Sequence, residues 1–178
     1  MDRLTERQGE MGAEVTFTLL EECPLALSQD EVERICDVVL KEEGIERPCM
    51  VSLTVTDDDG MRELNQEWRG IDAPTDVLSL ECERPDDPDL APGEPCELGD
   101  IVLAPGYIAR QAARLGVSAE SETRLLLVHG LLHLLGYDHI EDEEATVMEA
   151  REDELCALIA GGPTRHVRVT RHEDEVRE

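Results

Sequence analysis

The sequence predicts an α+β fold: a small mixed sheet of about four strands, covered by helices, with one buried helix at the centre. Three observations support this prediction. About four short segments have alternating apolar residues, several longer segments have apolar residues at helical spacing, and residues 125–135 are apolar on nearly every side. In chain order the elements read β, α, β, α, β, β, α, α, α.

The chain is predicted to form a single domain. Its 178 residues suffice for one domain with a moderate core, which we assign to residues 13–161. Residues 1–12 are expected to form a loose arm, and residues 162–178 a polar tail. Because aromatic residues make up only 2% of the chain, the core must consist mainly of Leu, Val, Ile and Ala.

The first elements follow from alternation and capping. Apolar and polar residues alternate over 15–19 and again over 51–55, which predicts two strands. Between them, Ser28 and Glu31 form a capping box that begins a helix, and Gly44 ends it. The inner face of this helix is predicted to consist of Val32, Ile35, Cys36, Val39 and Leu40.

The acidic triplet at residues 57–59 precedes a predicted helix over 60–68. A metal-binding cluster is one interpretation, but N-cap and helix-dipole chemistry explains the triplet more simply. Residues 75–80 and 98–103 are predicted strands. The proline-rich, acidic residues 81–97 between them are expected to form an exposed loop.

Three helices complete the domain. Pro105 and Gly116 bracket the first, over residues 106–115. Ser118 caps the second, which contains the buried apolar run. The third is acidic and covers about 142–159. Its inner stripe is predicted to consist of Val147, Met148, Leu155, Leu158 and Ile159.

Three of the five histidines lie in or just after the buried helix. His129 and His133 are one helical turn apart, so both imidazoles can reach one atom. Gly136 can end the helix in the left-handed conformation and let the chain bring His139 back toward them. Three imidazoles suit zinc and leave one position of a tetrahedron open, as in catalytic sites. The central helix is therefore predicted to bind one Zn²⁺ ion, although other divalent transition metals are also possible.

Other interpretations of the histidines explain their spacing less well. A single histidine on an apolar helix is usually a core residue, but three at this spacing favour a metal site. Asp138 is a candidate acceptor for a ligand N–H, although an aspartate in a turn also commonly caps backbone. In His-Glu-x-x-His peptidases the general base follows the first histidine. Gly130 occupies that position here, which disfavours peptide hydrolysis.

Residues 129–139 resemble the YbeY family, whose pattern His-Gly-x-Leu-His-Leu-x-Gly-Tyr-Asp-His they match at every position. Residues 64–80 resemble the family's Leu-Asn-x-x-Tyr-Arg and Thr-Asp-Val-Leu-Ser-Phe segments. Trp68 replaces the Tyr and Leu80 replaces the Phe, and we interpret both as variations within the core. The resemblance implies a zinc-dependent endoribonuclease that cleaves single-stranded RNA in ribosomal RNA maturation and ribosome quality control.

The resemblance also implies site residues. His129, His133 and His139 would bind the metal, and His129 and Arg69 would be catalytic. The family's arginine that matches Arg69 is held to be required, and a guanidinium can bind a phosphate through two hydrogen bonds. Arg110 and Arg114 lie one turn apart. They form either a solvated face or a substrate-binding patch for RNA phosphates.

Charge and cysteine content limit the possible partners. The net charge of −27 by itself argues against binding nucleic acid, so RNA would need a local arginine cluster. The alternative function is a non-catalytic ribosome-assembly factor with a structural metal, for which basic ribosomal proteins would be suitable partners. A cysteine as fourth ligand, with Cys82 and Cys156 as candidates, would favour that alternative.

The location is predicted to be cytoplasmic. The six cysteines form no Cys-x-x-Cys pair and the chain opens with no signal peptide, so thiols, several of them buried, are expected rather than disulfides. The longest apolar run, Leu125–Val128, is too short to span a membrane.

Overall fold

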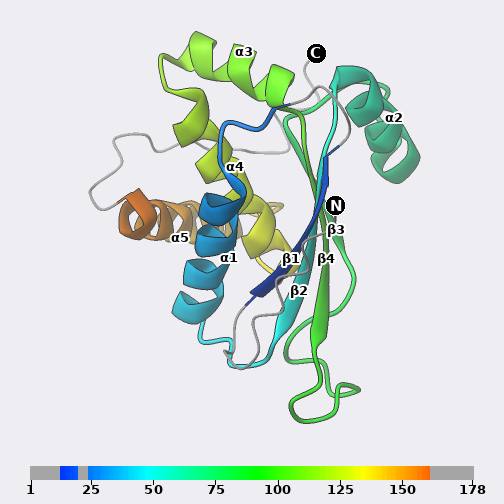
Figure 1. Ribbon diagram of the computed structural model, residues 1–178, viewed down its shortest axis with the longest axis vertical. Helices are drawn as coiled ribbons and strands as arrows, with labels where there is room; N and C mark the ends of the chain where they lie inside the picture. The colour runs from blue at the N-terminus through cyan, green and yellow to red at the C-terminus, as the bar shows by residue number, and fades with distance from the viewer. Residues whose placement is uncertain (1–12, 20–23, 161–178) are drawn as a thin grey trace.

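The sheet has four strands in the order β1-β2-β4-β3. The computed structural model describes residues 13–19 and 24–160, shown in Figure 1. β1 (Ala13–Leu19), β2 (Cys49–Val55) and β4 (Cys96–Leu103) are parallel neighbours, and β3 (Val77–Glu81) pairs antiparallel with β4. The predicted α+β class with a mixed sheet is confirmed. The predicted arm 1–12 and tail 162–178 lie outside the described residues.

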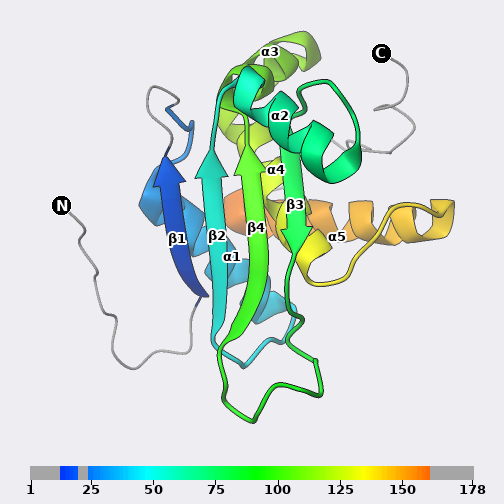
Figure 2. The same ribbon diagram turned by 90° about the vertical axis from the view of Figure 1, so that its right-hand side faces the viewer.

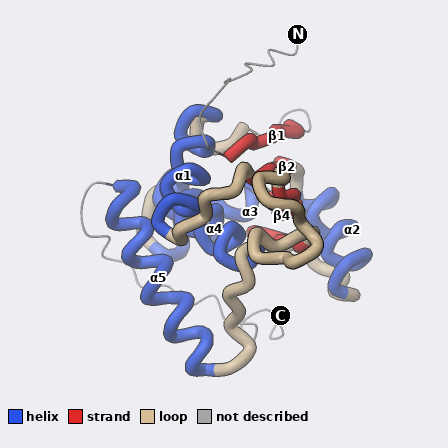
Figure 3. The backbone as a smooth tube through the Cα atoms, turned by 90° about the horizontal axis from the view of Figure 1, so that it is seen from below, coloured by secondary structure: helices blue, strands red, loops and turns tan. Residues whose placement is uncertain are grey.

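Helices cover the two faces of the sheet unequally. α1 (Gln29–Glu42), α4 (Ala119–Leu134) and α5 (Asp142–Ala160) lie on one face, while α2 (Asp58–Arg69) lies on the other (Figures 1 and 3). α3 (Pro105–Leu115) packs beside α4, and Figure 2 shows α2 at the upper end of the sheet, near the end of β4 and the start of β3. The larger core lies beneath α1, α4 and α5.

Local signals explain most helix boundaries. The capping box at Ser28 and Glu31 is formed as predicted, and all five residues of the predicted inner face of α1 are buried. Asp57 caps α2 by accepting a hydrogen bond from the backbone N–H of Gly60 at 2.8 Å, which confirms the capping interpretation of the acidic triplet. Ser118 caps α4 in the same way.

α4 is the central helix, and ten of its sixteen residues are buried. Gly130 faces the sheet, where a Cβ at this position would lie 3.1 Å from Ser79 Oγ and 3.3 Å from Ile101 Cδ1. The helix therefore lies so close to β3 and β4 that this position has no room for a larger side chain without movement of its neighbours. The predicted buried central helix is confirmed.

Two sequence predictions about packing were wrong. Val147 and Leu158 are 61% and 55% exposed, and the inner face of α5 instead consists of Ala145, Met148, Glu152, Leu155, Cys156 and Ile159. The buried face of α5 thus differs from the predicted one. It includes the carboxylate of Glu152, which has a partner, His129, on α4. Trp68 is 59% exposed on α2 rather than part of the core. Leu80 is partly buried and packs against the smaller core, under α2.

In the part of the chain that the structure describes, no helix has both the length and the apolar character needed to cross a membrane.

Candidate metal centre

The last two turns of α4 and the residues after them bring three histidines together. His129 and His133 lie on one face of the helix, which ends at Leu134. Gly136 has a φ of +103°, and its N–H donates to the carbonyl of His133 at 3.0 Å. The chain then reverses and returns His139 to the other two rings, as the sequence predicted. The potential ligand atoms of the three side chains all lie within 4.8 Å of one another.

His133 is held as a neutral imidazole. Burial, together with the neighbouring His129 and His139, lowers its pKa from 6.5 to about 3. Its Nδ1 lies 3.0 Å from the backbone carbonyl of Tyr137. Since a carbonyl can only accept, Nδ1 carries the proton and Nε2 carries the lone pair that a metal would use.

His129 is oriented by a carboxylate that sequence reasoning missed. Its Nδ1 donates a hydrogen bond to Oε1 of Glu152 on α5, and the two side chains are only 8% and 3% exposed. This partner again leaves Nε2 as the ligand atom, and a carboxylate behind a ligating histidine is a common feature of zinc sites. The available signal was the position of Glu152, four residues after Met148 in the apolar stripe of α5.

Asp138 has the second of the two roles considered for it, that of a residue that caps backbone in a turn. Its Oδ1 accepts a hydrogen bond from the backbone N–H of His139 at 2.7 Å. Glu152 and the Tyr137 carbonyl are the acceptors for the ring N–H groups of His129 and His133. Asp138 therefore shapes the turn that carries the third histidine.

The three histidines fit a transition-metal ion. Imidazole nitrogens suit Zn²⁺ and its neighbours in the first transition row, and two of the rings have their tautomers set toward a shared ion. Among the described residues, no cysteine belongs to the cluster. Neither Cys82 nor Cys156 is part of this cluster, so neither closes the site as the alternative prediction required.

Comparison with known proteins places this centre in a family. The family model described as "Endoribonuclease YbeY" matches residues 20–160. The chain belongs to the YbeY family. It is 45% identical to the endoribonuclease YbeY of Moorella thermoacetica over 71% of this chain and 83% of that protein. It is 40% identical to the endoribonuclease YbeY of Micrococcus luteus over 82% of this chain and 92% of that protein.

The fold of this chain is similar to that of a solved structure. The solution structure of TM1509 from Thermotoga maritima matches with a TM-score of 0.57 and 25% identity, over 83% of this chain and 90% of that one.

The arginines predicted for the YbeY site lie on other elements. Arg69 is the last residue of α2, partly buried, on the face of the sheet opposite α4. Arg110 lies on α3, where it forms an ion pair with Asp58 and its guanidinium lies 5.8 Å from the Tyr107 ring centroid. Arg114 is in the last turn of α3. α3 packs beside the start of α4, whereas the histidines lie at its end.

Arg84 is a cation that sequence reasoning did not single out. It lies beside residues 133–139, which we call the metal turn. It belongs to the loop between β3 and β4. Its Nη1 would lie 2.9 Å from a Cβ built on Gly136, midway between His133 and His139 in sequence. Arg84 Nη2 forms an ion pair with Oε2 of Glu81 at 3.3 Å, and the two side chains are 51% and 47% exposed.

Proposed function

We propose that this chain is a zinc-dependent endoribonuclease that hydrolyses phosphodiester bonds of single-stranded ribosomal RNA during its maturation and in ribosome quality control. Membership of the YbeY family supports the reaction and the substrate. The single structural observation that carries the proposal is the cluster of three histidines, without a cysteine, at the end of α4. The proposed location is the cytoplasm, where reduced thiols like the five described ones are maintained.

Zinc is proposed because the donor set suits it. His129, His133 and His139 would bind the ion through three imidazoles, and Glu152 and the Tyr137 carbonyl would keep two of these rings oriented. A zinc ion bound there would supply Lewis-acid catalysis for phosphodiester hydrolysis. The protein's part is to hold these nitrogens in place before the substrate arrives.

Four arginines are proposed as phosphate ligands. Arg69 lies on α2, on the face of the sheet opposite α4, so its proposed role of neutralising charge on the scissile phosphate rests on the family pattern alone. Arg110 and Arg114 would contact phosphates farther away. Arg84 is added because it packs against Gly136 in the metal turn. In a chain with a net charge of −27, such local cations must provide the attraction for RNA, so binding should weaken strongly with salt.

Arg84 is better placed to exchange its partner than Arg62, Arg47 and Arg34 are. Its bond to Glu81 is 3.3 Å long, whereas Arg62, Arg47 and Arg34 are held by bonds of 2.6–2.7 Å. An exposed ion pair of this length contributes little free energy. A phosphate that approaches the metal turn can therefore replace Glu81 at small cost.

The alternative, an assembly factor with a structural metal, rests on the acidic charge, which would suit basic ribosomal proteins. It also requires a fourth protein ligand. The described cysteines do not provide one, which favours the hydrolase. A peptidase is disfavoured further, because position 130 faces β3 and β4 and has no room for a base.

The test combines metal analysis with RNA cleavage. Purified parent chain should contain about one zinc ion and cleave a single-stranded RNA oligonucleotide. A chelator should abolish cleavage, and added zinc should restore it. His129→Ala and His133→Ala should lose both metal and activity, while Cys82→Ser, at an exposed thiol, should keep both. Folded histidine variants that cleave RNA at the parent rate would disprove the proposal.

A further inference from the structure

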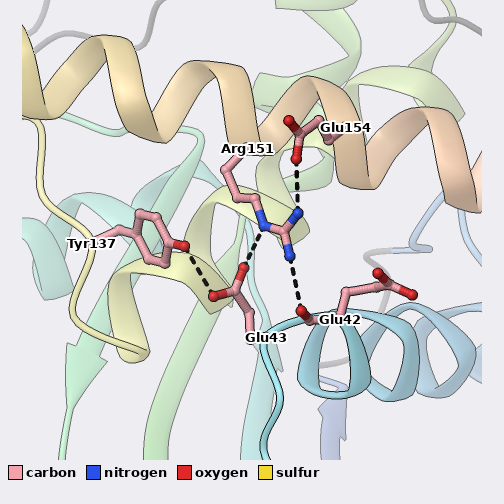
Figure 4. Close-up of polar contacts among 5 residues, drawn as sticks. All are labelled: Glu42, Glu43, Tyr137, Arg151 and Glu154. Carbon is pink, nitrogen blue, oxygen red and sulfur yellow. Dashed lines mark hydrogen bonds and ion pairs between the residues drawn. The ribbon is translucent and has the colours of Figure 1, made fainter.

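The C-terminal end of α1 is connected to the metal turn by one carboxylate. Glu43 follows the last residue of α1, and its side chain is only 13% exposed. Oε2 of Glu43 accepts a hydrogen bond from the hydroxyl of Tyr137 at 2.9 Å, and Oε1 accepts one from Nε of Arg151 at 2.6 Å. Figure 4 shows Glu43 between these two side chains.

Arg151 fixes the position of Glu43. Its Nη2 donates to the carbonyl of Glu42 at 2.9 Å, and its Nη1 donates to Oε2 of Glu154 at 2.8 Å (Figure 4). A carboxylate with little solvent contact needs such a cation, because burial of an unpaired charge is costly. The guanidinium thus joins the end of α1 to α5 and presents the second oxygen of Glu43 to Tyr137.

Tyr137 connects Glu43 to His133 and His139. It is part of the turn between His133 and His139, and its backbone carbonyl accepts the Nδ1–H of His133 at 3.0 Å. The residue is therefore anchored at both ends, by its hydroxyl to Glu43 and by its carbonyl to a ligand ring. A shift of Tyr137 would move the acceptor that sets the His133 tautomer, and also the backbone that carries His139.

α5 supports the metal centre at two successive residues. Arg151 holds Glu43, and Glu152 holds His129. The three ligands consequently depend on the same segment of α5, His129 directly and the other two through Glu43 and Tyr137. α1, far away in sequence, contributes the carboxylate that completes this arrangement.

We propose that Glu43 is a positioning residue for the metal centre, acting through Tyr137 on His133 and His139 without contacting the ion. The inference rests on the proposed metal binding by the three histidines. It assigns Glu43, Tyr137 and Arg151 a role in zinc affinity, which a purely structural role in joining α1 to α5 would not require.

The test measures zinc affinity of the purified full-length chain by competition with a chromophoric chelator, and the visible spectrum of the Co²⁺ form. Tyr137→Phe removes one oxygen, and Glu43→Gln removes the charge. Each should weaken zinc binding on the order of 10-fold, the lower end of the effect of changes in partners of metal ligands, and alter the Co²⁺ spectrum. Glu154→Gln removes only the exposed partner of Arg151 and should bind zinc as the parent does.

The outcomes separate this inference from the proposed function. Parent-like zinc affinity and Co²⁺ spectra in Tyr137→Phe and Glu43→Gln would overturn the role of Glu43 while leaving the enzyme intact. An equal loss of zinc affinity in Glu154→Gln would also overturn the role of Glu43, because the weaker binding would then reflect general destabilisation of the protein. If the parent binds no zinc, the metal centre and this inference fail together. If Glu43→Gln does not fold, Tyr137→Phe decides.

Discussion

Nδ1 of His129 on α4 donates a hydrogen bond to the carboxylate of Glu152 on α5, and both side chains are buried. This contact joins residues 23 positions apart in sequence and turns one ring of the cluster toward its neighbours. It also explains why a glutamate lies in the apolar stripe of α5. Loss of the hydrogen-bond partner of a metal-binding histidine commonly weakens metal binding substantially.

Glu152→Gln should therefore weaken zinc binding by about 10- to 100-fold. The amide oxygen can still accept from Nδ1, but the negative charge that strengthens His129 as a ligand is lost. The measurement is chelator competition on the purified chain, with Glu154→Gln on the same helix as control. Unchanged affinity in Glu152→Gln would show that the carboxylate serves packing alone.

Gly136→Ala should destabilise the protein more than Gly116→Ala. Both glycines have positive φ, +103° and +71°, so each substitution strains the backbone by about 1–2 kcal/mol. The φ of Gly116 lies at the edge of the left-handed region that other residues can adopt, whereas that of Gly136 lies well outside it, so the strain is greater at Gly136. The Arg84 guanidinium, 2.9 Å from the new Cβ of Gly136, is the end of a flexible, exposed side chain and can move aside. Urea unfolding measures the difference, and equal costs would show that the backbone at position 136 relaxes to a conformation that alanine adopts.

The metal-free protein should lose a specific part of its stability in acid because of His133. Its pKa is about 3 in the folded chain and 6.5 in the unfolded one. The unfolded state therefore binds a proton first, so stability is full above about pH 6.5 and falls as the pH decreases toward 3. Between pH 7 and pH 5 the loss should be on the order of 2 kcal/mol.

His133→Gln isolates that contribution from the many carboxylates of the chain. The difference in unfolding free energy between parent and variant, measured in urea with a chelator present, should shrink from pH 7 to pH 5. A difference that stays constant with pH would mean that His133 is protonated in the folded state near its ordinary pKa.

How much the sequence could predict depended on how local each signal was. The three histidines lie within one helix and its following turn, so spacing alone predicted that they meet. The inner face of α1 was likewise predicted from local periodicity, and all five residues are buried. Such patterns depend only on backbone geometry over a few turns.

The supporting contacts could not be predicted in this way. Glu43 and Arg151 are 108 residues apart, and nothing local to either residue indicates the other. On α5, Val147 and Leu158 were assigned to the inner face because they are apolar, whereas the charged Glu152 occupies it because His129 supplies a partner. Trp68 was placed in the core for its bulk, although α2 presents it to solvent.

Arg84→Gln should weaken RNA binding without changing zinc affinity. Loss of one phosphate contact should raise KM several-fold and reduce the slope of log affinity against log salt by about 0.7, the value expected for one contact to a single strand. Glu81→Gln should have the opposite effect on KM, because it removes the carboxylate that competes for Arg84. Arg62→Gln is the control, since that exposed arginine is held by two bonds to Asp72. If Arg84→Gln and Arg62→Gln give the same KM and salt slope as the parent, the cation beside the metal turn does not contact RNA, and the phosphate ligands must be sought on α2 and α3.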